Sequence, residues 1–356
     1  MMMLLILFTI LGSAMCFLPY QKKNVGLLSF VSRENDVVVV GVPRETDVDE
    51  CRVGLIPENC LLLIEKGFKV VVENDAGLHS SINTEDYEKV GCRIVDKNEV
   101  WKSDIIIKIQ PPSIYEAKML ENRTIYSFIQ PSINQDLLAI LRSQGSSVFS
   151  MDSFSASQSI VSGYRAVVET LSVFDRFLPQ QITTSGELPS AKLFVWGAGI
   201  AGLSAIRTAV TMGANVSAYD TRESVREKVE SLGATFLIDD DNSGKSIKKW
   251  VIDADIIITT VLIPDQPTPQ LISSEMVSCM KAGSVILDMA ASPSGGNVEN
   301  SKHDSLIITE NNVKIIGYTD LPSRLANSAS RLYGNSAANF VLNSWSATSR
   351  DPLIRG

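Results

Sequence analysis

Three glycines spaced as G-x-G-x-x-G give this chain its clearest chemical motif. They follow the apolar run 191–196 and open a segment with helical periodicity, and Asp220 lies eighteen residues beyond the last of them. Between a strand and a helix, Gly197 permits a tight turn, Gly199 lets the backbone approach a pyrophosphate, and Gly202 lets helix and strand pack closely. The pattern therefore predicts a dinucleotide-binding site.

The residues after the second expected strand bear on the choice of dinucleotide. The Asp220 carboxylate can accept hydrogen bonds from the hydroxyls of an adenosine ribose, and its negative charge repels a 2′-phosphate. This predicts NAD(H) as the cofactor. Arg222 keeps NADP(H) open as an alternative, because a nearby arginine can receive a 2′-phosphate. The N-terminus of the predicted helix supplies partial positive charge for the phosphates.

Candidates for catalysis are few. Lys108 ends an apolar run, and the carboxyl ends of parallel strands face ligand crevices. Other charges lie near expected element ends, at Arg52, Arg165, Asp320 and Arg324. Each is more typical of a structural ion pair or a solvated charge. The chain has two histidines, which argues against histidine-centred catalysis or a multi-histidine metal site. We therefore name no catalytic or metal-ligating residue.

The bulk composition narrows the function classes. The 356 residues are 45% hydrophobic and 20% charged, an ordinary globular composition with room for two domains. A net charge of −8 argues against a nucleic-acid partner, which needs a basic face. The five cysteines form no C-x-x-C pair, which favours reduced, mostly buried thiols over a zinc site or a disulfide framework.

Apolar strand-like runs alternate with helical segments from residue 37 onward. The first half has runs at 37–43, 69–75, 92–96, 104–110, 124–130 and 147–151, with helices expected at 59–67, 81–91 and 133–145. The second half has runs at 191–196, 215–220, 255–260, 284–289 and 313–318, with helices expected at 163–178 and 328–342. This alternation predicts an α/β fold of two Rossmann-like, doubly wound parallel-sheet domains, the second carrying the glycine motif.

The same pattern suggests domain boundaries. We expect an N-terminal α/β domain at 37–160, a Rossmann NAD-binding domain with its linking helix at 161–325, and a C-terminal helix at 326–356 that returns to the first domain. Between the first two lies the serine-rich stretch Phe149–Val167, whose composition predicts a polar linker between strand and helix.

The first 36 residues predict targeting segments. Residues 4–12 form an apolar core too short to span a membrane, and Ala14-Met15-Cys16 is similar to a cleavage site. Residues 1–16 are therefore predicted to be a signal peptide, with a short membrane anchor as the alternative. Residues 17–36, basic and free of acidic groups as far as Arg33, resemble a transit leader. We expect a plastid location, with the mitochondrial inner membrane as the alternative, and a soluble mature chain.

Eight motifs in order resemble the NAD(H)-binding domain I of proton-translocating NAD(P) transhydrogenases, the N-terminal part of their alpha subunit. They lie at 41–53, 104–112, 163–169, 195–203, 259–264, 281–290, 295–297 and 317–324. The resemblance covers 37–345. It implies pyrophosphate contacts from Ala198, Gly199 and Ile200. It also implies ribose contacts from Asp220, Thr221 and Arg222, and an adenine contact from Leu262.

The resemblance implies a mechanism and partners as well. In that family, NADH on domain I passes a hydride directly to NADP⁺ on a separate domain III, and a membrane domain II couples the transfer to proton movement. No acid or base on domain I is needed. Domain I proteins of this family are dimers, so we expect a homodimer. We also expect the membrane and NADP(H)-binding domains to lie outside this chain.

Two alternatives remain open. Alanine dehydrogenases share the fold, but the positions of their catalytic lysine and histidine hold Gln110 and Gln130 here, although Arg52 matches their substrate-binding arginine. An NAD(H)-binding module without hydride transfer is the second. In transhydrogenases a nicotinamide-holding loop separates the residues matching 151–153 from those matching 163–166, and here about a dozen residues of it are missing. The segment after 233–236, which usually reaches over the nucleotide, is also short.

Overall fold

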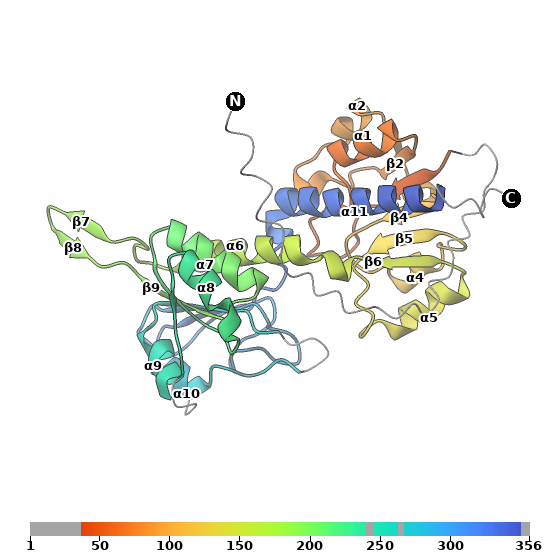
Figure 1. The fold of residues 1–356 in the computed structure, drawn as a ribbon. Helices are drawn as coiled ribbons and strands as arrows, with labels where there is room; N and C mark the ends of the chain where they lie inside the picture. Colours follow the sequence, from red (N-terminus) through yellow and green to blue (C-terminus); the bar gives the residue numbers. More distant parts are fainter. Residues whose placement is uncertain (1–36, 240–244, 263–266, 350–356) are drawn as a thin grey trace. The chain divides into compact units, whose positions relative to one another are not determined.

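The computed structural model describes residues 37–239, 245–262 and 267–349 (Figure 1). The predicted signal peptide and transit-like leader lie outside these residues, as does the tip of the shortened segment after 233–236. Within the described ranges, no helix is both long and apolar enough to cross a bilayer.

The first half forms a six-stranded parallel sheet in the order β3-β2-β1-β4-β5-β6. Its strands are β1 (Val39–Val42), β2 (Lys69–Glu73), β3 (Arg93–Val95), β4 (Ile105–Ile107), β5 (Thr124–Ser127) and β6 (Ser147–Ser150). Successive side chains of a strand point to opposite faces. Ile105 and Ile107 accordingly belong to one apolar core and Ile106 to another. Both faces of the sheet are therefore covered, as the continuous apolar runs predicted.

Helices cover each face of this sheet. The elements are α1 (Pro57–Glu65), η1 (Leu78–Ser80), α2 (Thr84–Lys89), α3 (Lys97–Val100), α4 (Ile114–Ala117), α5 (Gln135–Ser143) and η2 (Met151–Phe154). Leu63 of α1 and Tyr87 of α2 pack in one core, whereas Val100 of α3 and Leu141 of α5 pack in the other. The C-terminal helix α11 (Ala326–Ser349) also packs in the first core, where Figure 1 shows it in blue beside the strands.

The second half forms a seven-stranded sheet in the order β11-β10-β9-β12-β13-β15-β14. Its strands are β9 (Lys192–Trp196), β10 (Asn215–Tyr219), β11 (Thr235–Phe236), β12 (Ile256–Thr259), β13 (Val285–Asp288), β14 (Leu306–Ile308) and β15 (Lys314–Ile316). Among the described pairs of this sheet, only β14–β15 is antiparallel. Helices α7 (Ile200–Thr211) and α8 (Arg226–Ser231) cover one face, and α9 (Lys245–Asp253) and α10 (Ser274–Ser278) the other. The predicted doubly wound α/β fold is confirmed.

The prediction of a polar linker in the serine-rich stretch was wrong. After η2, helix α6 (Ala156–Val173) begins at once, seven residues before the expected start. The Ser159 and Ser162 hydroxyls donate to backbone carbonyls four residues earlier in the chain. Their hydrogen-bonding capacity is therefore satisfied within the helix. Gln158 and Val161, three residues apart, are buried on one face of α6. Small serines thus fit a helix whose buried face is set by its other residues.

The expected connection from 179 to 190 also contains structure. Strands β7 (Gln181–Thr183) and β8 (Gly186–Leu188) form an antiparallel hairpin. A short helix η4 (Ser323–Leu325) precedes α11, which exceeds the predicted range 328–342 at both ends.

Candidate functional site

The glycine motif forms the turn between β9 and α7. Gly197 has φ of 103°, a left-handed conformation that favours glycine. A Cβ atom on Gly202 would lie 1.9 Å from the Gly197 carbonyl oxygen, so only glycine permits this approach of helix to turn. A Cβ atom on Gly199 would meet nothing within 4 Å, so the backbone there faces open space. The turn has the geometry that the spacing predicted.

The sheet brings three segments together at one edge. Strand β9 lies between β10 and β12, and Trp196 is in register with both Tyr219 and Thr259. The residues that follow these strands, from 197, 220 and 260, are therefore neighbours at the carboxyl edge. This is also where the strand order reverses, because β10 and β12 flank β9 on opposite sides. Ligands of open α/β sheets bind at such a switch point.

Asp220 is bound tightly into this edge. Its Oδ2 accepts a hydrogen bond of 2.8 Å from the Ala198 N–H, and its Oδ1 one of 2.9 Å from the Arg222 N–H. Its side chain is 7% exposed. Burial raises the pKa of the Asp220 carboxyl, but the hydrogen bonds from Arg222 and Ala198 outweigh it, and the pKa lies below its ordinary value. Asp220 is therefore an anion at neutral pH.

The other predicted contact residues differ in exposure. Ala198 is buried, Ile200 is half exposed at the first turn of α7, Thr221 is exposed, and Leu262 is 69% exposed. The structure thus brings Ala198, Asp220 and Arg222 into direct contact. No contact between Leu262 and these three is described.

Asn297 has a structural role beside this edge that the sequence did not predict. It is fully buried, its Nδ2 donates to the carbonyls of Val261 and Pro269, and its Oδ1 accepts from the Val261 N–H. It therefore fixes the segment that carries Leu262. The only signal was the G-G-N motif at 295–297, which gave no role to the asparagine.

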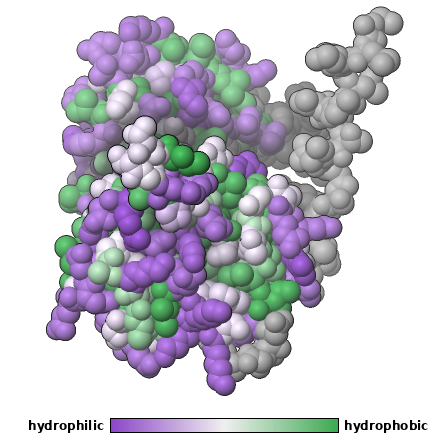
Figure 2. Space-filling model, turned by 90° about the vertical axis from the view of Figure 1, so that its left-hand side faces the viewer, coloured by the Kyte–Doolittle hydropathy of each residue, from purple (hydrophilic) through white to green (hydrophobic). Residues whose placement is uncertain are grey.

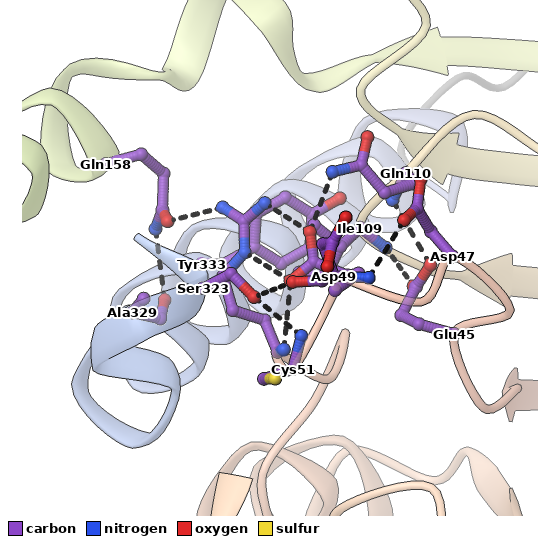
Figure 3. A network of polar contacts seen from close by, with 12 residues as sticks. Glu45, Asp47, Asp49, Cys51, Ile109, Gln110, Gln158, Ser323, Ala329 and Tyr333 are labelled. Atoms are coloured by element: carbon purple, nitrogen blue, oxygen red, sulfur yellow. Dashed lines mark hydrogen bonds and ion pairs between the residues drawn. The ribbon is translucent and has the colours of Figure 1, made fainter. Parts of the chain in front are cut away.

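A second polar cluster lies at the carboxyl edge of the first sheet (Figure 3). Lys108 Nζ donates to Glu45 at 2.7 Å, and both side chains are almost completely buried. Arg52 pairs with Glu50 through two nitrogens, at 2.7 and 2.5 Å. Gln110 donates its amide to Glu50 at 2.7 Å. Lys108 and Arg52 therefore form structural ion pairs, one of the two roles predicted for them.

Helices α6 and α11 close this cluster. Gln158 of α6 accepts from Arg52 at 2.9 Å and donates to the Ala329 carbonyl of α11 at 3.0 Å. Tyr333 of α11 donates its hydroxyl to the Lys108 carbonyl at 2.7 Å. Gln130 is exposed and lies outside the cluster. Its φ is 49°, and its backbone N–H donates to the Asp152 carboxylate.

The two buried glutamates of the cluster differ in acidity. Burial raises the pKa of Glu45 above its ordinary value in spite of Lys108. Burial also raises the pKa of Glu50, but the hydrogen bonds and charge of Arg52 outweigh it, and the net shift is downward. The remaining candidates are paired as well, Arg165 with Glu169 and Arg324 with Asp320. Every charge considered for catalysis thus has an ionic partner.

The residues at the second sheet's edge fit a dinucleotide. The first N–H groups of a helix have no acceptor within that helix, and at α7 they follow a turn open on the Gly199 side. A buried carboxylate lies beside this turn, at the distance along the chain that a ribose-binding acid requires. The chain thus supplies donors for phosphates and, in Asp220, a carboxylate of the kind that binds ribose hydroxyls.

Two family models match consecutive parts of the chain. The alanine dehydrogenase/PNT N-terminal domain matches residues 41–161, and the alanine dehydrogenase/PNT C-terminal domain matches residues 166–352. The chain belongs to the alanine dehydrogenase/PNT family.

Relatives within the alanine dehydrogenase/PNT family are named as transhydrogenases. NAD(P) transhydrogenase subunit alpha of Haemophilus influenzae is 40% identical over 85% of this chain and 65% of its own length. NAD(P) transhydrogenase subunit alpha of Cereibacter sphaeroides is 37% identical over 85% of this chain and 64% of its own length. The crystal structure of a transhydrogenase from Sinorhizobium meliloti superposes with a TM-score of 0.81 at 35% identity, covering 85% of this chain and 93% of that one. The chain thus spans a little less than two thirds of the Haemophilus and Cereibacter relatives.

The path from β6 to α6 is short. Strand β6 ends at Ser150, η2 covers Met151–Phe154, and Ser155 alone separates η2 from α6. No loop lies in this described stretch, where the sequence suggested that a nicotinamide-holding loop is missing.

Proposed function

We propose that the chain is the NAD(H)-binding component of a proton-translocating NAD(P) transhydrogenase. The observation that carries the proposal is the buried, ionised Asp220 beside the glycine turn. The names of the Haemophilus and Cereibacter relatives support it. NADH would supply a hydride for NADP⁺ on a partner domain, and the hydride carries both electrons without an acid or base.

In this proposal each predicted contact residue lies against one part of the dinucleotide. The backbone at Gly199 and Ile200 holds the pyrophosphate, with Ala198, whose N–H is bound to Asp220, bordering it, and the N-terminus of α7 lends it positive charge. Asp220, Thr221 and Arg222 surround the adenosine ribose. Leu262, held in place through Asn297, lies against the adenine. The Asp220 carboxylate favours NAD(H) over NADP(H) by charge repulsion.

Alanine dehydrogenase activity is less well supported. Gln110, at the position of that enzyme's lysine, uses its amide to bind Glu50, and Gln130 is exposed. Neither amide can protonate a substrate carbonyl. One observation favours a second candidate, an NAD(H)-binding module without hydride transfer. The direct passage from η2 to α6 provides no loop that could hold a nicotinamide ring.

We further propose a homodimer that works with the NADP(H)-binding and membrane domains of transhydrogenase. A groove of about 610 Å³ between α6, α7 and the start of α11 supports self-association. Its lining includes the exposed apolar side chains Ile160, Tyr164 and Ile200. A second copy of the chain could cover these apolar side chains. Figure 2 shows that hydrophobic residues on one face gather in separate patches among hydrophilic ones.

A location in an organelle is also proposed, a plastid first and the mitochondrial inner membrane second. It rests on the leader at 1–36 alone, so a fluorescent fusion with and without these residues is the appropriate test.

The proposal is tested by binding and by transfer. The full chain is titrated calorimetrically with NADH, together with Asp220→Ala and the control Asp253→Ala. Asp253 is an exposed carboxylate that ends α9 and pairs with Lys192. Loss of Asp220 is expected to weaken NADH binding by about 1–3 kcal/mol, because ribose hydroxyls lose their buried acceptor. Asp253→Ala is expected to bind like wild type.

Transfer is measured after mixing with a separately produced NADP(H)-binding transhydrogenase domain. Reduction of an NADP analogue by NADH supports the transhydrogenase component. Binding without reduction favours the module that only binds NAD(H). If Asp220→Ala and wild type bind NADH with equal affinity, the assignment of the NADH site to this edge is contradicted.

A further inference from the structure

All four acceptor positions of the Asp220 carboxylate are occupied by protein donors. Oδ1 accepts from the Arg222 N–H and Nε, both at 2.9 Å. Oδ2 accepts from the Ala198 N–H at 2.8 Å and from Arg222 Nη2 at 3.0 Å. An ionised carboxylate offers about four lone-pair sites. Asp220 therefore has no free acceptor position for a ribose hydroxyl.

Two of these four donors can leave and two cannot. The backbone N–H groups of Ala198 and Arg222 belong to the turns that follow β9 and β10. The other two come from the Arg222 guanidinium, whose side chain is 60% exposed while that of Asp220 is 7% exposed. An exposed arginine can exchange its partner for water at low cost. The guanidinium is thus the part of the arrangement that can move away.

We propose that the Arg222 side chain competes with the adenosine ribose for Asp220, and so sets both the affinity for NAD(H) and its preference over NADP(H). This deepens the proposed function and rests on it. Asp220 can accept from ribose hydroxyls only after Nε and Nη2 of Arg222 release it. Once released, the guanidinium is a free cation near the ribose and favours a ligand that carries a 2′-phosphate there. Arg222 therefore disfavours NAD(H) and favours NADP(H).

The experiment compares Arg222→Met with the matched control Arg226→Met by calorimetric titration with NADH. Methionine keeps a long apolar stem without donors. Arg226 is similarly exposed and pairs with Glu230 one turn away on α8. Arg222→Met is expected to raise NADH affinity about two- to tenfold, the range for an exposed but bidentate ion pair. Arg226→Met is expected to leave it unchanged.

Two further measurements separate competition from a general charge effect. In an Asp220→Ala background, the Arg222→Met change is expected to leave NADH affinity unaltered, since no carboxylate remains to compete for. The ratio of NADH to NADPH affinity is expected to rise in Arg222→Met alone. Equal or weaker NADH binding by Arg222→Met overturns the inference, as does an equal gain in the Asp220→Ala background.

The outcomes distinguish this inference from the proposed function. If wild type binds NADH and Arg222→Met binds it equally, the inference fails and the function stands. If neither protein binds NADH, both fail. Binding that is detected only in Arg222→Met supports both.

Discussion

At the scale of single residues, spacing along the chain predicted the position of Asp220 but not which polar groups meet. The acid beside the glycine turn followed from its distance along the chain. The pairing of Lys108 with Glu45, sixty-three residues apart, did not, because such contacts are set by the packing of strands and loops. Arg222 was expected near the ribose site, yet the structure directs it to Asp220 rather than to open solvent.

The Glu50–Arg52 pair gives a prediction about stability. Glu50→Gln leaves the guanidinium of Arg52 buried without its anion, and is expected to lower the free energy of unfolding at pH 7 by about 3–5 kcal/mol. The pKa of Glu50 is lowered in the folded protein. The stabilisation that the Glu50 carboxylate provides is therefore complete above pH 4.5, the ordinary pKa of this group. It is lost as the pH falls through the lower pKa of the folded protein.

Urea unfolding at pH 7 and at pH 3 measures this effect. The difference in the free energy of unfolding between wild type and Glu50→Gln is expected to be smaller at pH 3 than at pH 7. Glu58→Gln is the control, because Glu58 is exposed and paired with Arg331, and such pairs contribute less than about 1 kcal/mol. A gap that stays constant with pH argues against the assignment of this stability to the Glu50 carboxylate.

At the scale of elements, long apolar strands were predicted to within a few residues, and short or polar elements were missed. Strand β11 has two residues and the edge strand β14 has three, so each is too short to stand out as a strand from its sequence alone. The start of α6 was missed because three of its first seven residues are serines. A helix in that stretch is held by tertiary contacts rather than by its own propensity.

Gln158 is the residue that best tests this account of α6. Gln158→Leu removes the acceptor for Arg52 and the donor for the Ala329 carbonyl, both inside the protein. We expect a loss of about 1–3 kcal/mol in the free energy of unfolding, from polar groups left buried without partners. Ser162→Ala, which deletes only a hydroxyl bonded within α6, is expected to change stability by less than about 0.5 kcal/mol. Chemical denaturation followed by circular dichroism compares the two, and a larger effect for Ser162→Ala contradicts the proposed anchoring.

At the scale of the whole molecule, the groove along α6 and α7 bears on assembly. A carboxylate at Ile160 would place a charge among the apolar side chains of any dimer interface formed through this groove. Ile160→Asp is therefore expected to weaken dimerisation at least about a hundredfold. Sedimentation velocity across a concentration series measures it. Val48→Asp, at an apolar residue that is almost fully exposed and lies outside the groove, is the control. A wild-type chain that stays monomeric, or Ile160→Asp that dimerises normally, excludes this groove as the interface.

The parallel strands of both sheets were predictable because buried strands carry continuous valine and isoleucine. The groove was not, since its residues come from α6, α7 and the start of α11, which are separate segments of the sequence. Periodicity shows which face of a helix is apolar but not that part of this face remains open.

The aromatic residues that end β9 and β10 give the site a fluorescent group of its own. Trp196 directly precedes Gly197, and its ring lies 6.1 Å from that of Tyr219, which directly precedes Asp220 and lies 5.8 Å from Trp250. Indole emission overlaps the absorption band of a reduced nicotinamide. A reduced dinucleotide held at this edge would therefore quench tryptophan fluorescence by energy transfer, and its oxidised form, which lacks that band, would not. Tryptophan fluorescence would therefore report whether a dinucleotide bound at this edge is reduced or oxidised.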